Sequence, residues 1–203
     1  AGADAVVLPG GFSYGDAVAA GRIAAQLIRS HLWNGLMRAV ERGVPMIAPC
    51  NGFQIAVQAG LLPGPGNDAD WPAAPSAAEV ALADNDSARF IDRWVEVEYP
   101  GDTVCVWTRG LESDNTTSML PIAHGEGRFI SGGQLEHLRE AGQIAVRYAE
   151  GDNPNGSDGR VAGICDASGL ILGLMPHPER YTRWTQHPYW TRLDETDRKG
   201  DTP

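Results

Sequence analysis

Cys50 is the residue whose type and position in this sequence best suit covalent catalysis. It follows an apolar run, Val44–Ala48, and precedes an amphipathic segment that extends to Gly60. A cysteine at such a strand-to-helix junction lies above the end of a sheet, with the N–H groups of the following helix directed at whatever it attacks. The alternative is an inert buried cysteine, which is the commoner role for a single thiol.

A histidine and a carboxylate far along the chain supply the other groups that a cysteine nucleophile needs. His177 and Glu179 are two residues apart, and Pro176 and Pro178 flank the histidine. The prolines disfavour helix, and in extended backbone such residues point to the same side. The imidazole would then act as the base and the carboxylate would orient it. The alternative is a proline-rich surface turn with both side chains solvated.

The elements that position these residues begin with a β-α-β-α order. Apolar runs at Asp4–Pro9 and Val44–Ala48 predict strands. Helical spacing predicts one helix over Ile23–Val40, ended by Gly43, and a second helix from Cys50 to Gly60. This order predicts an α/β fold with a mostly parallel central sheet and helices on its faces.

The second half of the chain predicts an antiparallel section. The expected elements are a loop over Leu62–Ala78, strands over Phe90–Tyr99 and Thr103–Thr108 joined by Pro100-Gly101-Asp102, a helix over Leu135–Ala141, a strand over Gln143–Tyr148, a loop over Asp152–Gly159, and a hairpin of Val161–Cys165 and Leu170–Met175. The second strand of this last hairpin leads directly into Pro176 and His177.

Composition limits the class of protein. The 203 residues carry a net charge of −10, which argues against binding nucleic acid, because that requires clustered Lys and Arg. Three widely separated cysteines favour neither a disulfide framework nor a zinc site. No apolar run is long enough to span a bilayer, so we expect a cytoplasmic protein without membrane contact. We expect a single domain over residues 1–193 and a polar tail over 194–203.

Five motifs resemble those of a known family. They are LPGGFSYGD (Leu8–Asp16), CNGFQ (Cys50–Gln54), IAHGEGRF (Ile122–Phe129), NPNGS (Asn153–Ser157) and MPHPER (Met175–Arg180). In this order they are similar to the class I glutamine amidotransferase subunit of phosphoribosylformylglycinamidine synthase. The resemblance covers most of the chain and implies the flavodoxin-like fold of class I glutamine amidotransferases.

The resemblance implies a role for each catalytic residue. Cys50 would attack the side-chain amide of glutamine, His177 would carry the proton to the departing ammonia, and Glu179 would orient His177. The γ-glutamyl thioester formed on Cys50 would then be hydrolysed to glutamate. The ammonia would serve formylglycinamidine ribonucleotide synthesis in de novo purine biosynthesis.

Other residues are expected around the substrate. The oxyanion needs fixed donors, for which the backbone at Gly10 and Gly11 and the N–H of Asn51 are candidates; a simple strand-to-helix turn at the glycines is the alternative. Gln54 lies one helical turn beyond Cys50, where its amide would help to seat the substrate; an exposed polar helix residue is the alternative reading.

His124 and Glu126 form a further pair of ionisable side chains, two residues apart in a predicted extended segment. The resemblance implies that both border the pocket or the route of ammonia, with His124 among the substrate-binding residues. The pair has too few ligands at a recognised spacing for a metal site, and none is expected.

The resemblance also implies the partners. Glutamine is the expected substrate, a large synthetase subunit is the expected partner, and a small bridging subunit is expected in the same complex. The sequence has no GxxxxGK[ST] motif, so ATP and Mg²⁺ are expected on the synthetase and no cofactor in this subunit.

Two departures from the family keep other functions open. Relatives usually carry glycine and an aliphatic residue where this chain has Ala48 and Pro49, and they begin with an additional β-α unit ahead of Asp4–Pro9. Pro49 fixes φ and removes a donor beside the nucleophile. The alternatives are therefore another cysteine-dependent amidotransferase or amidase, and a catalytically silent interaction subunit.

Overall fold

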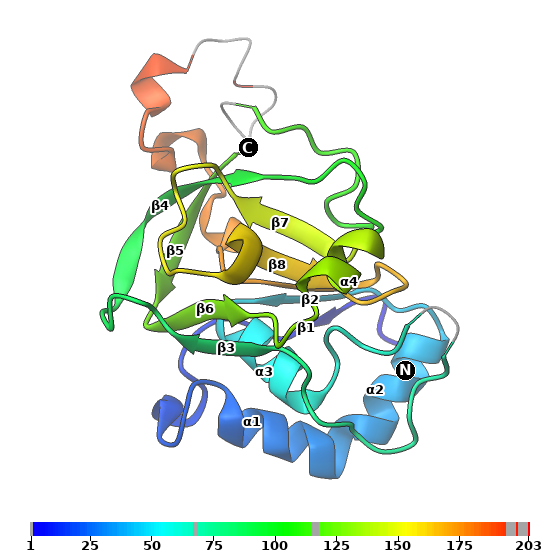
Figure 1. The fold of residues 1–203 in the computed structure, drawn as a ribbon. Helices are drawn as coiled ribbons and strands as arrows, with labels where there is room; N and C mark the ends of the chain where they lie inside the picture. Colours follow the sequence, from blue (N-terminus) through cyan, green and yellow to red (C-terminus); the bar gives the residue numbers. More distant parts are fainter. Residues whose placement is uncertain (1, 67–68, 115–117, 194–197, 199–202) are drawn as a thin grey trace.

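The computed structural model describes residues 2–66, 69–114, 118–193, 198 and 203 (Figure 1). Its strands are β1 (Val6–Val7), β2 (Met46–Pro49), β3 (Ala81–Asp84), β4 (Ile91–Glu98), β5 (Met119–His124), β6 (Glu126–Ile130), β7 (Ile144–Tyr148), β8 (Val161–Cys165) and β9 (Ile171–Leu174). Its α-helices are α1 (Arg22–Leu27), α2 (Trp33–Glu41), α3 (Asn51–Ala59) and α4 (Leu135–Glu140).

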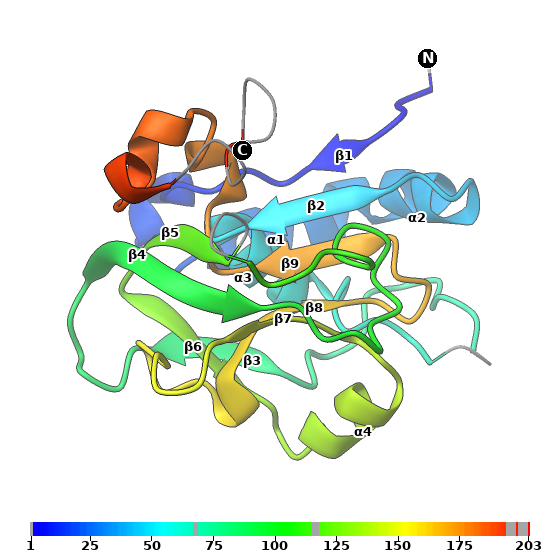
Figure 2. The ribbon, with the colours of Figure 1, turned by 90° about the horizontal axis from the view of Figure 1, so that it is seen from above.

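Seven strands form one sheet in the order β1-β2-β9-β8-β7-β4-β5. Strands β1, β2 and β9 are parallel, and the remaining neighbours pair antiparallel. Figure 2 shows β2, β9, β8 and β7 following one another away from β1. In Figure 1, α1, α2 and α3 lie together on one side of this sheet. The predicted α/β fold class with an antiparallel section is confirmed.

The alternating side chains of the central strands fill two cores. In β9, Ile171 packs into the core under α1, α2 and α3, whereas Leu172 packs into the core on the opposite face. The first core includes Phe53 of α3, which is fully buried, and burial of such a side chain contributes about 2–3 kcal/mol to folding. Because both faces of the central strands are covered, nearly continuous apolar runs are the expected sequence pattern.

The first predicted helix is present but contains a π-helical turn. Helix α1 continues through a π turn over Ile28–Leu32 into α2. The hydroxyl of Ser30 donates to the Gln26 carbonyl at 2.7 Å within this stretch, a contact that commonly accompanies local distortion of a helix. Gly43 follows the helix with φ 69°, as its predicted role at the helix end requires.

The predicted strand over Thr103–Thr108 is wrong. The backbone N–H groups of Val104 and Val106 donate to Gly142 and Gly169, which lie in turns, and residues 106–110 form a turn themselves. This segment covers the second core with Cys105, and burial of alternate side chains there imitates a strand pattern. Strand β4 instead pairs antiparallel with β5, where Trp94 lies opposite Pro121, and with β7 on its other side.

A second sheet was not predicted. Strand β3 pairs antiparallel with β6, and the register shifts between Ala83 and Asp84. The described parts of the predicted loop, 62–66 and 69–78, contain neither helix nor strand. Loop residue Pro72 accepts a hydrogen bond from the indole of Trp33 in α2 at 3.2 Å.

The predicted division into a domain over 1–193 and a tail over 194–203 stays a prediction, since most of that tail lies outside the described residues. Within the described part of the chain, no helix is long and apolar enough to cross a membrane.

Gly173 of β9 provides a test of the core packing. A Cβ atom at this position would lie 2.2 Å from Cδ2 of Phe53 and 2.6 Å from Cδ1 of Leu62. We expect Gly173→Ala to lower the free energy of unfolding by about 1–3 kcal/mol, because the core must shift to accept a methyl group. Urea unfolding followed by circular dichroism measures this change.

Gly101→Ala is the matched control, because a Cβ there meets nothing within 4 Å. Its effect should stay within about 0.5 kcal/mol. Equal unfolding midpoints for the two variants would contradict the packing described for β9 and α3.

Candidate active site

Cys50 occupies a strained backbone conformation at the junction of β2 and α3. Its φ of 49° and ψ of −109° lie outside the regions that L-residues favour. Its N–H donates to the Leu174 carbonyl at 2.7 Å, and its carbonyl accepts from Phe53 N–H at 2.9 Å. Such conformations persist only where the surrounding structure enforces them, and they are enriched at functional sites.

Gly52 permits the close approach that this turn requires. A Cβ at residue 52 would lie 1.9 Å from the Leu8 carbonyl oxygen, so only glycine fits. The end of the β1 segment therefore packs directly on the first turn of α3. This contact places Gly10 and Gly11, which follow Leu8, next to the cysteine turn.

Pro49 is compatible with the sheet because of where its nitrogen points. Ile47 accepts from Leu8 N–H on the β1 side of β2, and Cys50 donates to Leu174 on the β9 side. Since hydrogen-bonding direction alternates along a strand, Pro49 N faces β1, which ends at Val7. Because β1 has already ended, the missing N–H of Pro49 removes no hydrogen bond between β2 and β1.

The Cys50 thiol is buried and hydrogen-bonded. The side chain is 5% exposed, and Sγ lies 3.6 Å from the Ala123 carbonyl oxygen of β5, to which the thiol donates. The next carbonyl on the same side of β5, that of Pro121, accepts the backbone N–H of His177 at 2.8 Å. One edge of β5 thus holds both the thiol and the histidine segment.

His177 and Glu179 are in contact, as predicted. The His177 Nδ1 atom lies 2.7 Å from Oε1 of Glu179. The backbone is not extended throughout, however, because Pro178–Arg180 forms a 3₁₀ turn with Arg180 N–H bonded to the His177 carbonyl at 3.0 Å. Proline favours the first position of such a turn, which explains why the expected extended segment is wrong here.

The pKa of His177 reflects both partners. Burial is the largest single influence and lowers it, but hydrogen bonding and charge from Cys50 and Glu179 together outweigh burial and raise the pKa of His177 to about 9. For Glu179, burial raises the pKa, but the hydrogen bond from His177 and the positive charges nearby lower it overall. The His177 and Glu179 pair therefore favours an imidazolium beside a carboxylate.

The two glycines predicted beside the cysteine lie at the site. A Cβ at Gly10 would lie 2.9 Å from Cε1 of His177, so this glycine allows the imidazole to approach. Gly11 has φ 121° and borders the cavity next to Cys50. Donation by these backbone groups to an oxyanion stays a prediction.

Asn51 and Gln54 form a buried pair on the first turn of α3. The Asn51 amide donates to Oε1 of Gln54 at 2.9 Å, and its Oδ1 accepts from Ser13 N–H at 3.1 Å. Gln54 Nε2 donates to the Glu126 carbonyl oxygen. Gln54 is buried, so the alternative of an exposed polar residue is wrong.

His124 is buried at the end of β5 and held by Asn85. The Asn85 amide donates to the carbonyls of His124 and Arg89, so its Oδ1 is the acceptor facing His124 Nδ1 at 3.0 Å. Nδ1 of His124 therefore carries the proton. Burial, with a smaller effect from positive His177, lowers the pKa of His124 to about 4, which keeps the ring neutral at pH 7.

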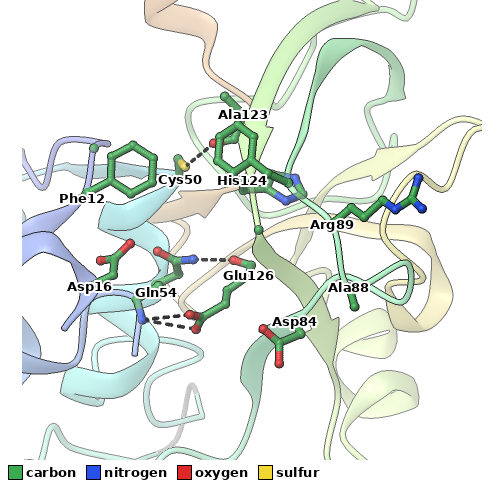
Figure 3. Close-up of a pocket in the computed structure, with 14 residues that line it drawn as sticks. Phe12, Asp16, Cys50, Gln54, Asp84, Ala88, Arg89, Ala123, His124 and Glu126 are labelled. Atoms are coloured by element: carbon green, nitrogen blue, oxygen red, sulfur yellow. Dashed lines mark hydrogen bonds between the residues drawn. The ribbon is translucent and has the colours of Figure 1, made fainter. Parts of the chain in front are cut away.

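A cavity of about 370 Å³ lies beside Cys50, Gln54 and His124 (Figure 3). It is lined by Gly11, Phe12, Asp16, Ala20, Cys50, Gln54, Asp84, Ala88, Arg89, Phe90, Ala123, His124, Gly125 and Glu126. Glu126 reaches across to Ala20, whose N–H lies 3.3 and 3.2 Å from the two carboxylate oxygens. The volume is suited to a small polar metabolite.

Several of these neighbours were not predicted. Asp16, Asp84 and Arg89 border the cavity, and Asn85 holds His124 from the adjacent β3 turn. Only Asp16 lies within a motif that the sequence singled out. The described residues contain no group of three or more His, Cys, Asp or Glu side chains able to hold a metal ion.

The chain is similar to known proteins. Residues 1–202 match the CobB/CobQ-like glutamine amidotransferase domain family. The PurQ subunit of phosphoribosylformylglycinamidine synthase from Frankia casuarinae is 43% identical over 182 residues, which span 88% of this chain and 68% of that protein. The PurQ subunit from Methanococcus maripaludis is 37% identical over 97% of this chain and 72% of that protein.

A solved structure is also similar. The structure of PurLQS from Thermotoga maritima contains a chain that matches with a TM-score of 0.66 at 36% identity, over 88% of this chain and 70% of that one.

The coupling between Cys50 and His177 is measurable. We expect Cys50→Ala to lower the pKa of His177 well below 9, because the Cys50 side chain that raises this pKa is gone while the burial that lowers it remains. NMR titration of the His177 ring in the two proteins gives both pKa values.

Cys105→Ala removes a different buried thiol and serves as the control. It should leave the titration of His177 unchanged. A His177 pKa that is the same with and without Cys50 would contradict an influence of Cys50 on the imidazole.

Proposed function

The chain belongs to the glutamine amidotransferase family, alongside the PurQ subunits of phosphoribosylformylglycinamidine synthase, and we propose that Cys50, His177 and Glu179 are its catalytic triad. Its activity is that of the glutaminase subunit, which releases ammonia from glutamine for purine biosynthesis. The observation that carries the triad is the strained Cys50 turn beside a histidine whose Nδ1 is 2.7 Å from Glu179.

In the first chemical step the Cys50 thiolate attacks the carboxamide carbon of glutamine. His177, which holds the thiol proton as imidazolium, gives it to the nitrogen as the C–N bond breaks, so that ammonia leaves and a γ-glutamyl thioester remains. Water then attacks the thioester, with His177 taking one of its protons, and glutamate departs. The raised pKa of His177 favours the proton-bearing form that the first step needs.

Backbone donors beside Cys50 stabilise the oxyanion in this proposal. The first N–H groups of a helix have no intrahelical partner, and Asn51 is the first residue of α3. Gly11 borders the same cavity from the opposite segment. A donor of this kind contributes roughly 10²–10³ to the rate of acyl transfer.

Gln54 and His124 shape the substrate pocket in the same proposal. Gln54 ties α3 to the backbone of Glu126, and His124 anchors the end of β5 through Asn85. Pro49 was one reason to consider a catalytically silent subunit. It leaves the Cys50 turn and the hydrogen bond from Cys50 to Leu174 intact. That geometry supports catalysis over the silent alternative.

Ammonia delivery requires a synthetase partner at the cavity mouth. Phe12, Tyr14, Val18 and Phe90 are 54–64% exposed, and the rings of Phe12 and Phe90 lie 6.3 Å apart at the cavity. Exposed apolar side chains grouped at a site favour a docking surface. The partner is the large synthetase subunit, which supplies ATP and Mg²⁺, and a small bridging subunit completes the complex in the cytoplasm.

The triad is tested by glutamine hydrolysis in the presence of the synthetase. Cys50→Ala and His177→Asn should each lower kcat by about 10⁴-fold or more, because each removes a group that acts as part of a unit. Glu179→Gln should lower kcat by at least about 10²-fold, because a neutral amide no longer supports the imidazolium. Ammonia release measured by a coupled assay gives these values.

Cys105→Ala is again the matched control and should retain hydrolysis. A glutamine-analogue chloroketone should alkylate wild-type protein and Cys105→Ala, but not Cys50→Ala. Hydrolysis that survives in Cys50→Ala would exclude the proposed nucleophile.

The docking surface is tested with Tyr14→Asn combined with Val18→Ser. Asparagine tolerates the φ of 54° at residue 14, so the turn is retained while apolar surface is lost. We expect synthetase binding to weaken about 10-fold or more, because exposed aromatic residues are frequent binding hot spots. Analytical ultracentrifugation of the mixed subunits measures the dissociation constant.

Val106→Ser removes an exposed apolar side chain on a segment away from the cavity lining and should leave the dissociation constant unchanged. If the control variant weakened binding and the double variant did not, the synthetase would dock elsewhere.

A further inference from the structure

The charge of the cavity lining is unbalanced. Three carboxylates, those of Asp16, Asp84 and Glu126, line it against the one guanidinium of Arg89. Figure 3 shows Cys50 on one side of the cavity and the Asp84 and Glu126 side chains on the opposite side, with Arg89 extending away. A ligand whose reacting end meets Cys50 therefore presents its other end to negative charge.

Glu126 is the most firmly positioned of the three carboxylates. Both of its oxygens accept from Ala20 N–H, and its backbone carbonyl accepts from the buried Gln54 amide. Among the described residues, no salt bridge neutralises this carboxylate. Asp84, in contrast, is exposed at the end of β3, where the register shifts. Glu126 therefore offers a fixed, unneutralised charge to a cation in the cavity.

The spacing from Cys50 fits an amino-acid substrate. Gln54 is four residues beyond Cys50 along α3, about 6 Å along the helix axis, and its side-chain amide donates to the backbone carbonyl of Glu126. The side chain of glutamine spans a similar distance between its carboxamide carbon and its α-nitrogen. When the carboxamide lies at Cys50, the α-ammonium group lies on the acidic side of the cavity.

We propose that Glu126 binds the α-ammonium group of glutamine, so that the cavity selects the free amino acid. The assignment rests on the proposed function of Cys50 as the glutamine-attacking nucleophile. The Ala20 N–H keeps the carboxylate in place, and Asp16 and Asp84 add negative potential around it. Glutamine whose α-nitrogen is part of a peptide bond has no such ammonium group and is rejected.

The test compares glutamine with glutaramate, which keeps the carboxamide and the carboxylate but lacks the α-amino group. Wild-type protein with its synthetase should show a kcat/KM for glutamine about 10- to 100-fold above that for glutaramate, the expected effect of one charge-assisted hydrogen bond. Glu126→Gln should abolish most of this preference, mainly by raising KM for glutamine. A loss of structure alone would lower kcat/KM for both substrates and leave their ratio unchanged.

Glu126→Asp and Glu136→Gln complete the experiment. The aspartate keeps the charge and should retain part of the preference, whereas Glu136 is paired with Arg139 on α4 and its replacement should leave the ratio unchanged. A wild-type protein that accepts both substrates equally, or an unchanged ratio in Glu126→Gln, overturns the assignment. Absence of glutamine hydrolysis in the wild-type complex would instead overturn the proposed function.

Discussion

The backbone conformation of Cys50 is the constraint on which the rest of the site depends. Its φ of 49° is held by the hydrogen bond to Leu174 and by the contact of the Leu8 carbonyl with Gly52. Strands β1 and β9 must therefore lie in register on both sides of β2. The parallel part of the sheet and the first turn of α3 together direct the thiol toward β5, where Ala123 accepts its hydrogen bond.

The antiparallel part of the sheet positions the rest of the site. The carbonyls of Pro121 and Ala123 on one edge of β5 bind the His177 backbone and the Cys50 thiol. The turn after β5 then places Glu126 against Gln54 of α3. Substrate binding and nucleophile positioning consequently depend on the same strand, so a change in the register of β5 would disturb both.

Local features of the site could be predicted from the sequence, and long-range pairing could not. Cys50 follows a strand and begins a helix, and the two-residue spacing of His177 and Glu179 predicts their contact. The sequence pattern of Thr103–Thr108 resembles that of a strand because its buried side chains cover a core. Pro121 makes β5 hard to recognise as a strand from the sequence, although proline is tolerated in a strand at the sheet edge. Ala20, Asp84 and Asn85 reach the site only through contacts between distant segments, which no local pattern reveals.

Identification of the covalent intermediate tests the central claim most directly. Wild-type protein with its synthetase is mixed with glutamine, quenched in acid during turnover and digested for mass spectrometry. The account predicts a peptide containing Cys50 that is heavier by one glutamyl group and that loses this group on treatment with hydroxylamine. A glutamyl group on Cys105 or Cys165, or turnover with no modified peptide and full activity in Cys50→Ala, would contradict it.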